Sequence, residues 1–84
     1  MKRDKLFKKV LSGSKNVQFT EIKKFSEMFG FNLDRVNGSH HIFKHSNIPE
    51  LINLQNVHGK AKPYQIKQLL EVIERHNLNM EDKD

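Results

Sequence analysis

The sequence contains no cysteine and no tryptophan, and it has one tyrosine and two prolines among 84 residues. Without cysteine the chain has neither disulfide bonds nor thiolate ligands for a metal. No apolar run approaches the roughly 18 residues that a membrane-spanning helix needs, and no apolar signal-peptide core follows the basic start. These absences exclude disulfide-stapled and membrane-spanning classes, and we expect a cytoplasmic protein.

Positive charge is the strongest feature of the composition. Fifteen Lys and Arg residues against ten Asp and Glu give a net charge of +5, and the excess lies before residue 63. Such a field attracts polyanions and weakens with salt.

A chain this short forms one domain with one small core and cannot enclose a deep pocket. We therefore expect an open surface that binds nucleic acid. Binding to a membrane surface is disfavoured, because the N-terminal segments lack a wide apolar helix face.

Three segments have apolar residues at helical spacing. The first, 6–11, predicts a short helix, and the second, 19–29, predicts a longer one with Thr20 as its N-cap and Gly30 just after its end. The third begins near Pro63, a residue favoured at the first helical position. Its expected buried face consists of Ile66, Leu69, Leu70, Ile73 and His76.

Between the last two helices the apolar period changes to two, which is typical of strands. We predict strands at 31–36, 40–45 and 50–56, with turns at Asn37–Gly38 and at 46–49. The predicted fold is α+β, with the order α-β-β-β-α after an additional N-terminal helix. Its three-stranded antiparallel sheet packs one face on helices and leaves the other open.

The direction of the second strand depends on Phe43. Burying this aromatic side chain is worth more than burying Ile42, so we expect Phe43 to point inward together with His41 and His45. The opposite register would bury Ile42 and His40 instead. In the favoured register three residues face outward: His40, Ile42 and Lys44.

The run from Phe19 to Leu78 resembles the HicA toxins, the small RNA-cleaving halves of type II toxin–antitoxin pairs. Members of that family have a Gly-Ser-His motif at the start of the second strand, and Gly38, Ser39 and His40 match it. The strand around Asn53–Gln55 and the run Gly59–Gln65 also resemble this family. The resemblance implies a fold like the double-stranded-RNA-binding domain, with His40 as the catalytic histidine of a metal-independent mRNA endoribonuclease that needs no cofactor. It also implies a HicB-type antitoxin that covers the active site.

We expect residues 1–84 to form a single domain with a HicA-like core at 19–78. Residues 1–18 lie outside the resemblance and form a helical extension, which adds either to the core or to the basic surface. Residues 79–84 are expected to form a flexible acidic tail.

The chemistry of RNA cleavage supports the same residues. Without a metal, the ribose 2′-hydroxyl attacks the phosphate, which requires a base, an acid and positive groups. An imidazole takes and gives protons near neutral pH, so His40 can be that base or acid. The RNA-binding residues are expected to be Gly38, Ser39, Lys44, Lys60, Lys62 and Tyr64, helped by backbone N–H groups around Ala61 and Tyr64.

Several alternatives stay open. The second acid can be His41, His58 or Tyr64, or the mechanism can use one histidine. His40 can instead cap its turn, and the two lysines can be ordinary solvated charges. A zinc site among the four histidines between residues 40 and 58 is disfavoured, because His40 and His41 project to opposite faces of a strand. The alternative function is a non-catalytic RNA-binding module of the same fold. With one tyrosine and no tryptophan for stacking, we expect weak base selectivity.

Overall fold

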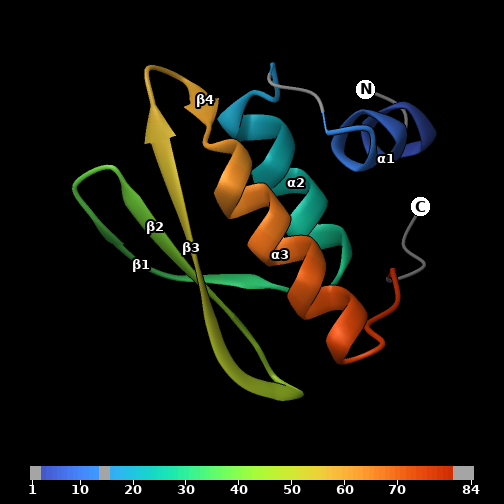
Figure 1. Cartoon of the computed structure of the whole chain (residues 1–84). Helices are drawn as coiled ribbons and strands as arrows, with labels where there is room; N and C mark the ends of the chain where they lie inside the picture. The colour runs from blue at the N-terminus through green and yellow to red at the C-terminus, as the bar shows by residue number, and fades with distance from the viewer. Residues whose placement is uncertain (1–2, 14–15, 81–84) are drawn as a thin grey trace.

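The computed structural model describes residues 3–13 and 16–80, which form three helices and a four-stranded antiparallel sheet (Figure 1). The helices α2 and α3 lie side by side against one face of the sheet, and α1 lies beyond them. The predicted α+β fold is confirmed. The elements in chain order are α1 (Arg3–Leu11), α2 (Phe19–Met28), β1 (Asn32–Asn37), β2 (His40–His45), β3 (Ile48–Val57), β4 (Lys60–Ala61) and α3 (Pro63–Arg75).

The sheet has the order β1-β2-β3-β4, so each strand pairs with its neighbour in sequence. The fourth strand, two residues long, lies where we expected only a basic loop, and the prediction of three strands is corrected accordingly. A two-residue turn of His58 and Gly59, with φ of 52° and 84°, connects it to β3. Both residues need positive φ in such a turn, and histidine is an uncommon choice there, so the sequence does not mark this hairpin.

The first hairpin turn lies one residue later than predicted. Asn37 pairs with His40 at the ends of β1 and β2, so the turn residues are Gly38 and Ser39. Gly38 has a φ of 62°, a conformation that glycine adopts without strain. The turn therefore places His40 as the first residue of β2, as predicted.

Strand β3 begins earlier than expected. The turn before it contains only Ser46 and Asn47, while Ile48 and Pro49 already belong to the strand. β4 pairs only with Asn56 and Val57, so the first part of β3 has one edge without a strand partner. Proline is tolerated at such an edge because no ladder hydrogen bond is lost.

Helix α2 begins differently from the prediction. Its N-cap is Gln18, whose backbone N–H donates to the Glu21 carboxylate at 2.9 Å, and Thr20 lies inside the first turn. The expected cap at Thr20 is therefore wrong, because the helix begins at Phe19, two residues earlier than a cap at Thr20 would allow. At the other end Gly30 follows with a φ of 90°, as predicted.

The predicted orientation of β2 is confirmed. Phe43 is fully buried, and it shares its side with His41 and His45. The His41 ring lies 4.5 Å from that of Phe19, and the His45 ring lies 5.1 Å from that of Phe31, measured between centroids. The side of β2 that faces the helices is thus aromatic, and His40 lies on the other side.

Helix α1 adds to the core, which settles the choice that the sequence left open. Leu6 and Val10 are at most 1% exposed, and the Phe7 ring lies near those of Phe25 and Phe29. On its polar side, Lys9 forms an ion pair with Glu21 of α2 at 2.8 Å. The extension is therefore packed into the same core as the rest of the domain.

Helix α3 begins at Pro63, as predicted, and buries Ile66, Leu69 and Ile73 against the sheet. Leu70 is half-buried. His76 follows the helix, is half-buried and contacts Glu50. Of the tail, Met80 packs against the core, and residues 81–84 lie outside the described residues.

Candidate functional site on the open face of the sheet

His40 lies on the sheet face that the helices leave uncovered. It opens β2 directly after the Gly38–Ser39 turn and pairs with Gln55 of β3. Its side chain is partly exposed. The buried neighbours Ile52 and Leu54 alternate with the polar residues that face His40. The imidazole is thus accessible to a large substrate, as a proton-transfer group for a polymer must be.

Two polar residues of β3 hold this part of the face in place. The Nδ1 atom of His40 lies 3.1 Å from Oδ1 of Asn53, and Nε2 has no hydrogen-bond partner within the described part of the chain. The Gln55 side chain donates through Nε2 to the Ser39 hydroxyl at 3.3 Å. The backbone N–H of Asn56 donates to the Ser39 carbonyl at 2.9 Å. The histidine and its turn are therefore fixed to β3 by side chains as well as by the ladder.

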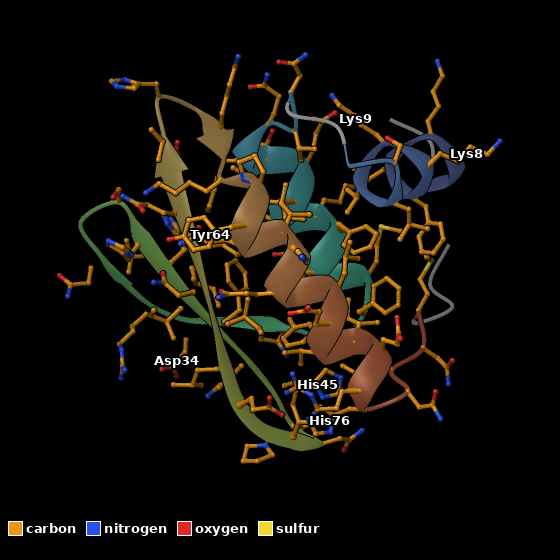
Figure 2. All side chains as sticks on the ribbon, viewed as in Figure 1. Lys8, Lys9, Asp34, His45, Tyr64 and His76 are labelled. Carbon is orange, nitrogen blue, oxygen red and sulfur yellow. The ribbon has the colours of Figure 1, made fainter. Side chains whose placement is uncertain are left out.

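The start of α3 lies next to the same part of β3. The backbone N–H of Gln55 donates to Oε1 of Gln65 at 2.7 Å, and Nε2 of Gln65 lies 3.5 Å from the Tyr64 hydroxyl. Lys62 holds its ammonium 5.8 Å from the centre of the Tyr64 ring. Tyr64 is 56% exposed. Figure 2 shows its ring at the start of α3, beside β3. The fold thus brings Tyr64 and Lys62 to the strand that carries the partners of His40.

Lys60 extends this basic edge. It pairs with Val57 across the β3–β4 hairpin, and Val57 follows Gln55 by two residues, so Lys60 and His40 share one face of the sheet. Strands β2 and β4 are each one strand away from β3, a separation of about 10 Å between them.

The backbone donors expected around Ala61 are not free. The N–H of Ala61 donates to the Val17 carbonyl at 3.0 Å, and the N–H of Gly59 donates to the Asn56 side chain at 2.7 Å. This part of the prediction is wrong, because β4 and the preceding turn use these groups in their own pairing. Positive charge near β4 therefore comes from the lysine side chains.

Lys44 lies apart from the other predicted site residues. It is four residues from His40 on the same strand, a distance of about 13 Å. Its ammonium lies 3.4 Å from the carboxylate of Asp34, whose position at the lower left of the sheet is labelled in Figure 2. Gly38 and Ser39 form the turn directly before His40, Lys60 shares its face of the sheet, and Lys62 and Tyr64 lie at the start of α3 beside β3. Lys44 lies apart from all of them.

The other histidines have separate surroundings. Nδ1 of His41 donates to the Ser39 carbonyl at 3.1 Å, on the face opposite to His40. His45 donates through Nε2 to the Phe29 carbonyl and accepts at Nδ1 from the Asn47 N–H, both at 3.0 Å. His58 is exposed in its turn. Within residues 3–13 and 16–80 no three His, Cys, Asp or Glu side chains are placed to hold a metal ion.

Two residues of this site were not among the predicted ones, Asn53 and Gln65. The alternation of Ile52 and Leu54 with polar residues identifies Asn53 as outward-facing, but it does not reveal contact with His40. Gln65 is only 3% exposed, yet it occupies an ordinary polar position in the helical pattern. Both roles depend on tertiary contacts between segments at least ten residues apart.

Helices packed on one face of an antiparallel sheet, in the order α-β-β-β-α, define a small α+β protein of the double-stranded-RNA-binding-domain type. The profile of the family described as "HicA toxin of bacterial toxin-antitoxin" matches residues 19–74, more than half of the chain. The chain therefore belongs to the HicA toxin family. It is a toxin of a toxin–antitoxin system and has an antitoxin as its partner. No curated protein and no solved structure matches it. Among the described helices, none is long and apolar enough to cross a membrane.

Proposed function

We propose that the protein is an endoribonuclease toxin that cleaves mRNA in the cytoplasm by metal-independent acid–base catalysis at His40. The observation that supports this most is the partly exposed imidazole of His40, which Asn53 holds on the open face and whose Nε2 atom has no partner among the described residues. The family match to HicA toxins points in the same direction. A general base or acid must be within reach of the ribose in this way.

In this mechanism His40 removes the proton of the ribose 2′-hydroxyl. The 2′-oxygen attacks the adjacent phosphorus, the bond to the 5′-oxygen breaks, and that oxygen takes a proton. The products are a 2′,3′-cyclic phosphate and a free 5′-hydroxyl. Of the candidate acids, Tyr64 is connected to β3 through Gln65, whose side chain contacts both the Tyr64 hydroxyl and the Gln55 backbone N–H. If His40 is the only catalytic side chain, solvent supplies the proton.

Lys60 and Lys62 contribute by binding phosphate. Negative charge builds up on the phosphate oxygens in the transition state, and positive groups held nearby stabilise it. Gly38 and Ser39 hold the backbone turn against which the ribose lies. Tyr64 offers its exposed face for stacking of one base, which is sequence-tolerant. We infer weak base selectivity from this single aromatic platform.

The antitoxin is proposed to be of the HicB type and to cover the face that carries His40. An acidic partner fits a chain of net charge +5. Its gene is expected to lie beside that of the toxin. Saturating the toxin with the purified partner should stop RNA cleavage, and cleavage that persists in the saturated complex would exclude this part of the proposal.

The decisive experiment compares the protein with its His40→Ala variant on RNA in the presence of EDTA. We expect cleavage by the unmodified protein and a loss of about 10²- to 10⁴-fold in the variant, because one positioned proton transfer is removed. Growth inhibition in cells should disappear with it. The fold should remain, since His40 is partly exposed and contributes nothing to the core.

The matched control is His76→Ala, which removes a histidine near the other end of β3, where it contacts Glu50. This variant should cleave at the normal rate. RNA with a 2′-deoxyribose at the cleavage site should resist the unmodified protein. Equal cleavage by His40→Ala, or RNA binding without any cleavage, would favour the non-catalytic RNA-binding module.

A further inference from the structure

The side chain of Asn53 makes a single polar contact with His40, and this contact has a direction. Oδ1 of Asn53 lies 3.1 Å from Nδ1 of His40. An amide oxygen only accepts hydrogen bonds, so Nδ1 must carry the proton for the contact to be favourable. In a neutral imidazole one nitrogen carries the proton and the other is the acceptor. The unprotonated nitrogen is then Nε2, which has no partner among the described residues.

We propose that Asn53 is the positioning residue of the site. It selects the Nδ1–H tautomer of His40 and presents Nε2 to the substrate as a base. His40 would then begin the reaction by accepting the 2′-hydroxyl proton, and the imidazolium that forms would keep its hydrogen bond to Asn53. This inference rests on the proposed function, because it assigns His40 the role of base.

The position of Asn53 on the strand supports this assignment. Its Cα partner on β2 is Ile42, so Asn53 reaches His40 diagonally on the same face. The segment is well fixed, because Ile52 and Leu54 on either side are buried in the core. A side chain on a strand held in this way is an accurate support for a catalytic group, more so than one on a loop.

Among the described residues, no charged side chain forms an ion pair or a hydrogen bond with His40. Asp34, the acidic group on the neighbouring strand, is paired with Lys44 and Arg35. Glu50, on the same strand as Asn53, is paired with Arg75 and contacts His76. The tautomer of His40 is therefore governed by the amide of Asn53 rather than by a carboxylate.

The structure supplies two internal references for a test. His41 donates through Nδ1 to a carbonyl oxygen, so it must also be the Nδ1–H tautomer. His45 donates through Nε2 to a carbonyl and accepts at Nδ1 from a backbone N–H, so it must be the Nε2–H tautomer. One spectrum of the imidazole nitrogens thus contains both reference states.

The experiment is nitrogen-15 NMR of the histidine rings in the free protein at about pH 8, above the usual pKa of an imidazole. Signals of His40 are assigned by their loss in His40→Ala. We expect His40 to resemble His41, with a protonated Nδ1, and to become a mixture of tautomers in Asn53→Ala. The matched control is Asn37→Ala, since Asn37 pairs with His40 from the other side and is exposed. It should leave the His40 signals unchanged.

Kinetics with RNA give an independent readout. In Asn53→Ala we expect kcat to fall roughly five- to tenfold with KM unchanged, the ordinary net effect of one hydrogen bond. Asn53→Asp keeps an acceptor at Nδ1 and should restore most of kcat. Its negative charge favours the imidazolium, so the rise of rate with pH should move to higher pH.

An Nε2–H tautomer in the unmodified protein, or a tautomer that Asn53→Ala does not change, would overturn this inference. Those results leave the proposed function untouched. Absence of RNA cleavage by the unmodified protein would instead overturn the proposed function, whatever the NMR spectra show. The two failures are therefore distinguishable.

Discussion

Among single residues, Gln65 connects helix α3 to β3, the strand that carries the partners of His40. Its side-chain oxygen accepts the backbone N–H of Gln55 at 2.7 Å, where β4 is too short to pair with β3. A helix side chain thus completes the hydrogen bonding of a strand edge. A buried backbone N–H that loses such a partner destabilises the fold. Gln65 therefore contributes to stability as well as to the position of the site.

We predict that Gln65→Leu lowers the free energy of unfolding by about 1–3 kcal/mol. The Gln55 N–H loses its acceptor, and the leucine side chain hinders water from replacing it. Denaturant unfolding followed by circular dichroism measures this. The control is Gln68→Leu, one turn further along α3 and exposed. Equal losses in the two variants would mean that the 2.7 Å contact adds no stability.

At the scale of elements, one carboxylate connects the N-terminal extension to the rest of the domain. Glu21 accepts from the Lys9 ammonium of α1 at 2.8 Å and from the Gln18 N–H at 2.9 Å. The hydrogen bond from Lys9 is the largest cause that lowers the pKa of Glu21, and the Gln18 N–H adds to it against the opposing effect of burial. Glu21 therefore serves both the cap of α2 and the docking of α1.

This lowered pKa makes stability depend on pH in a definite direction. The contribution of Glu21 is present above its unfolded-state pKa, near 4.5, and is lost as the pH falls through its lower folded-state pKa. We predict that Glu21→Gln costs about 0.5–1 kcal/mol at pH 7, a size limited by solvent screening. The difference from the unmodified protein should shrink as the pH falls below about 4.5.

Unfolding curves at a series of pH values test this. Glu27→Gln is the control, because Glu27 is more exposed and its distance to Lys23 is 4.0 Å. It should change stability little at any pH. A constant difference between Glu21→Gln and the unmodified protein down to low pH would show that the carboxylate charge is not what joins the two helices.

The elements that periodicity could locate are those whose side chains alternate between core and solvent. The bounds of β2 and the start of α3 at Pro63 follow from local pattern alone. Strand β4 did not, because it depends on pairing with β3. The Gln18 cap was missed for another reason: its partner Glu21 is only three residues away, but glutamine is not among the residues favoured at an N-cap. For the candidate site, the sequence motif predicted His40 and the lysines after Gly59, and the side of β2 on which His40 lies followed from burying Phe43. The sequence could not locate Asn53, since several outward polar residues of β3 fit the same pattern.

For the whole molecule, the distribution of charge decides where a polyanion binds, and the net charge does not. The C-terminal part of the chain is the acidic part, and Glu50, Glu71 and Glu74 line hollows beside α3 together with Arg75. The lysines of β4 and of the α3 N-cap lie at the opposite end of that helix. A polyanion is therefore directed to the end of the molecule that carries His40, and away from the C-terminal half of α3.

This asymmetry predicts the salt dependence of RNA binding. Each phosphate contact that is lost should reduce the slope of log affinity against log salt by about one unit. We expect Lys60→Ala and Lys62→Ala each to weaken binding and to reduce the slope by about that amount. Lys67→Ala, an exposed lysine further along α3, should leave the slope unchanged. Fluorescence anisotropy with an uncleavable 2′-deoxy strand between about 50 and 200 mM salt measures all three. If the Lys67 variant lost as much as the other two, the attraction would come from net charge alone, and the basic edge beside His40 would have no special part in binding.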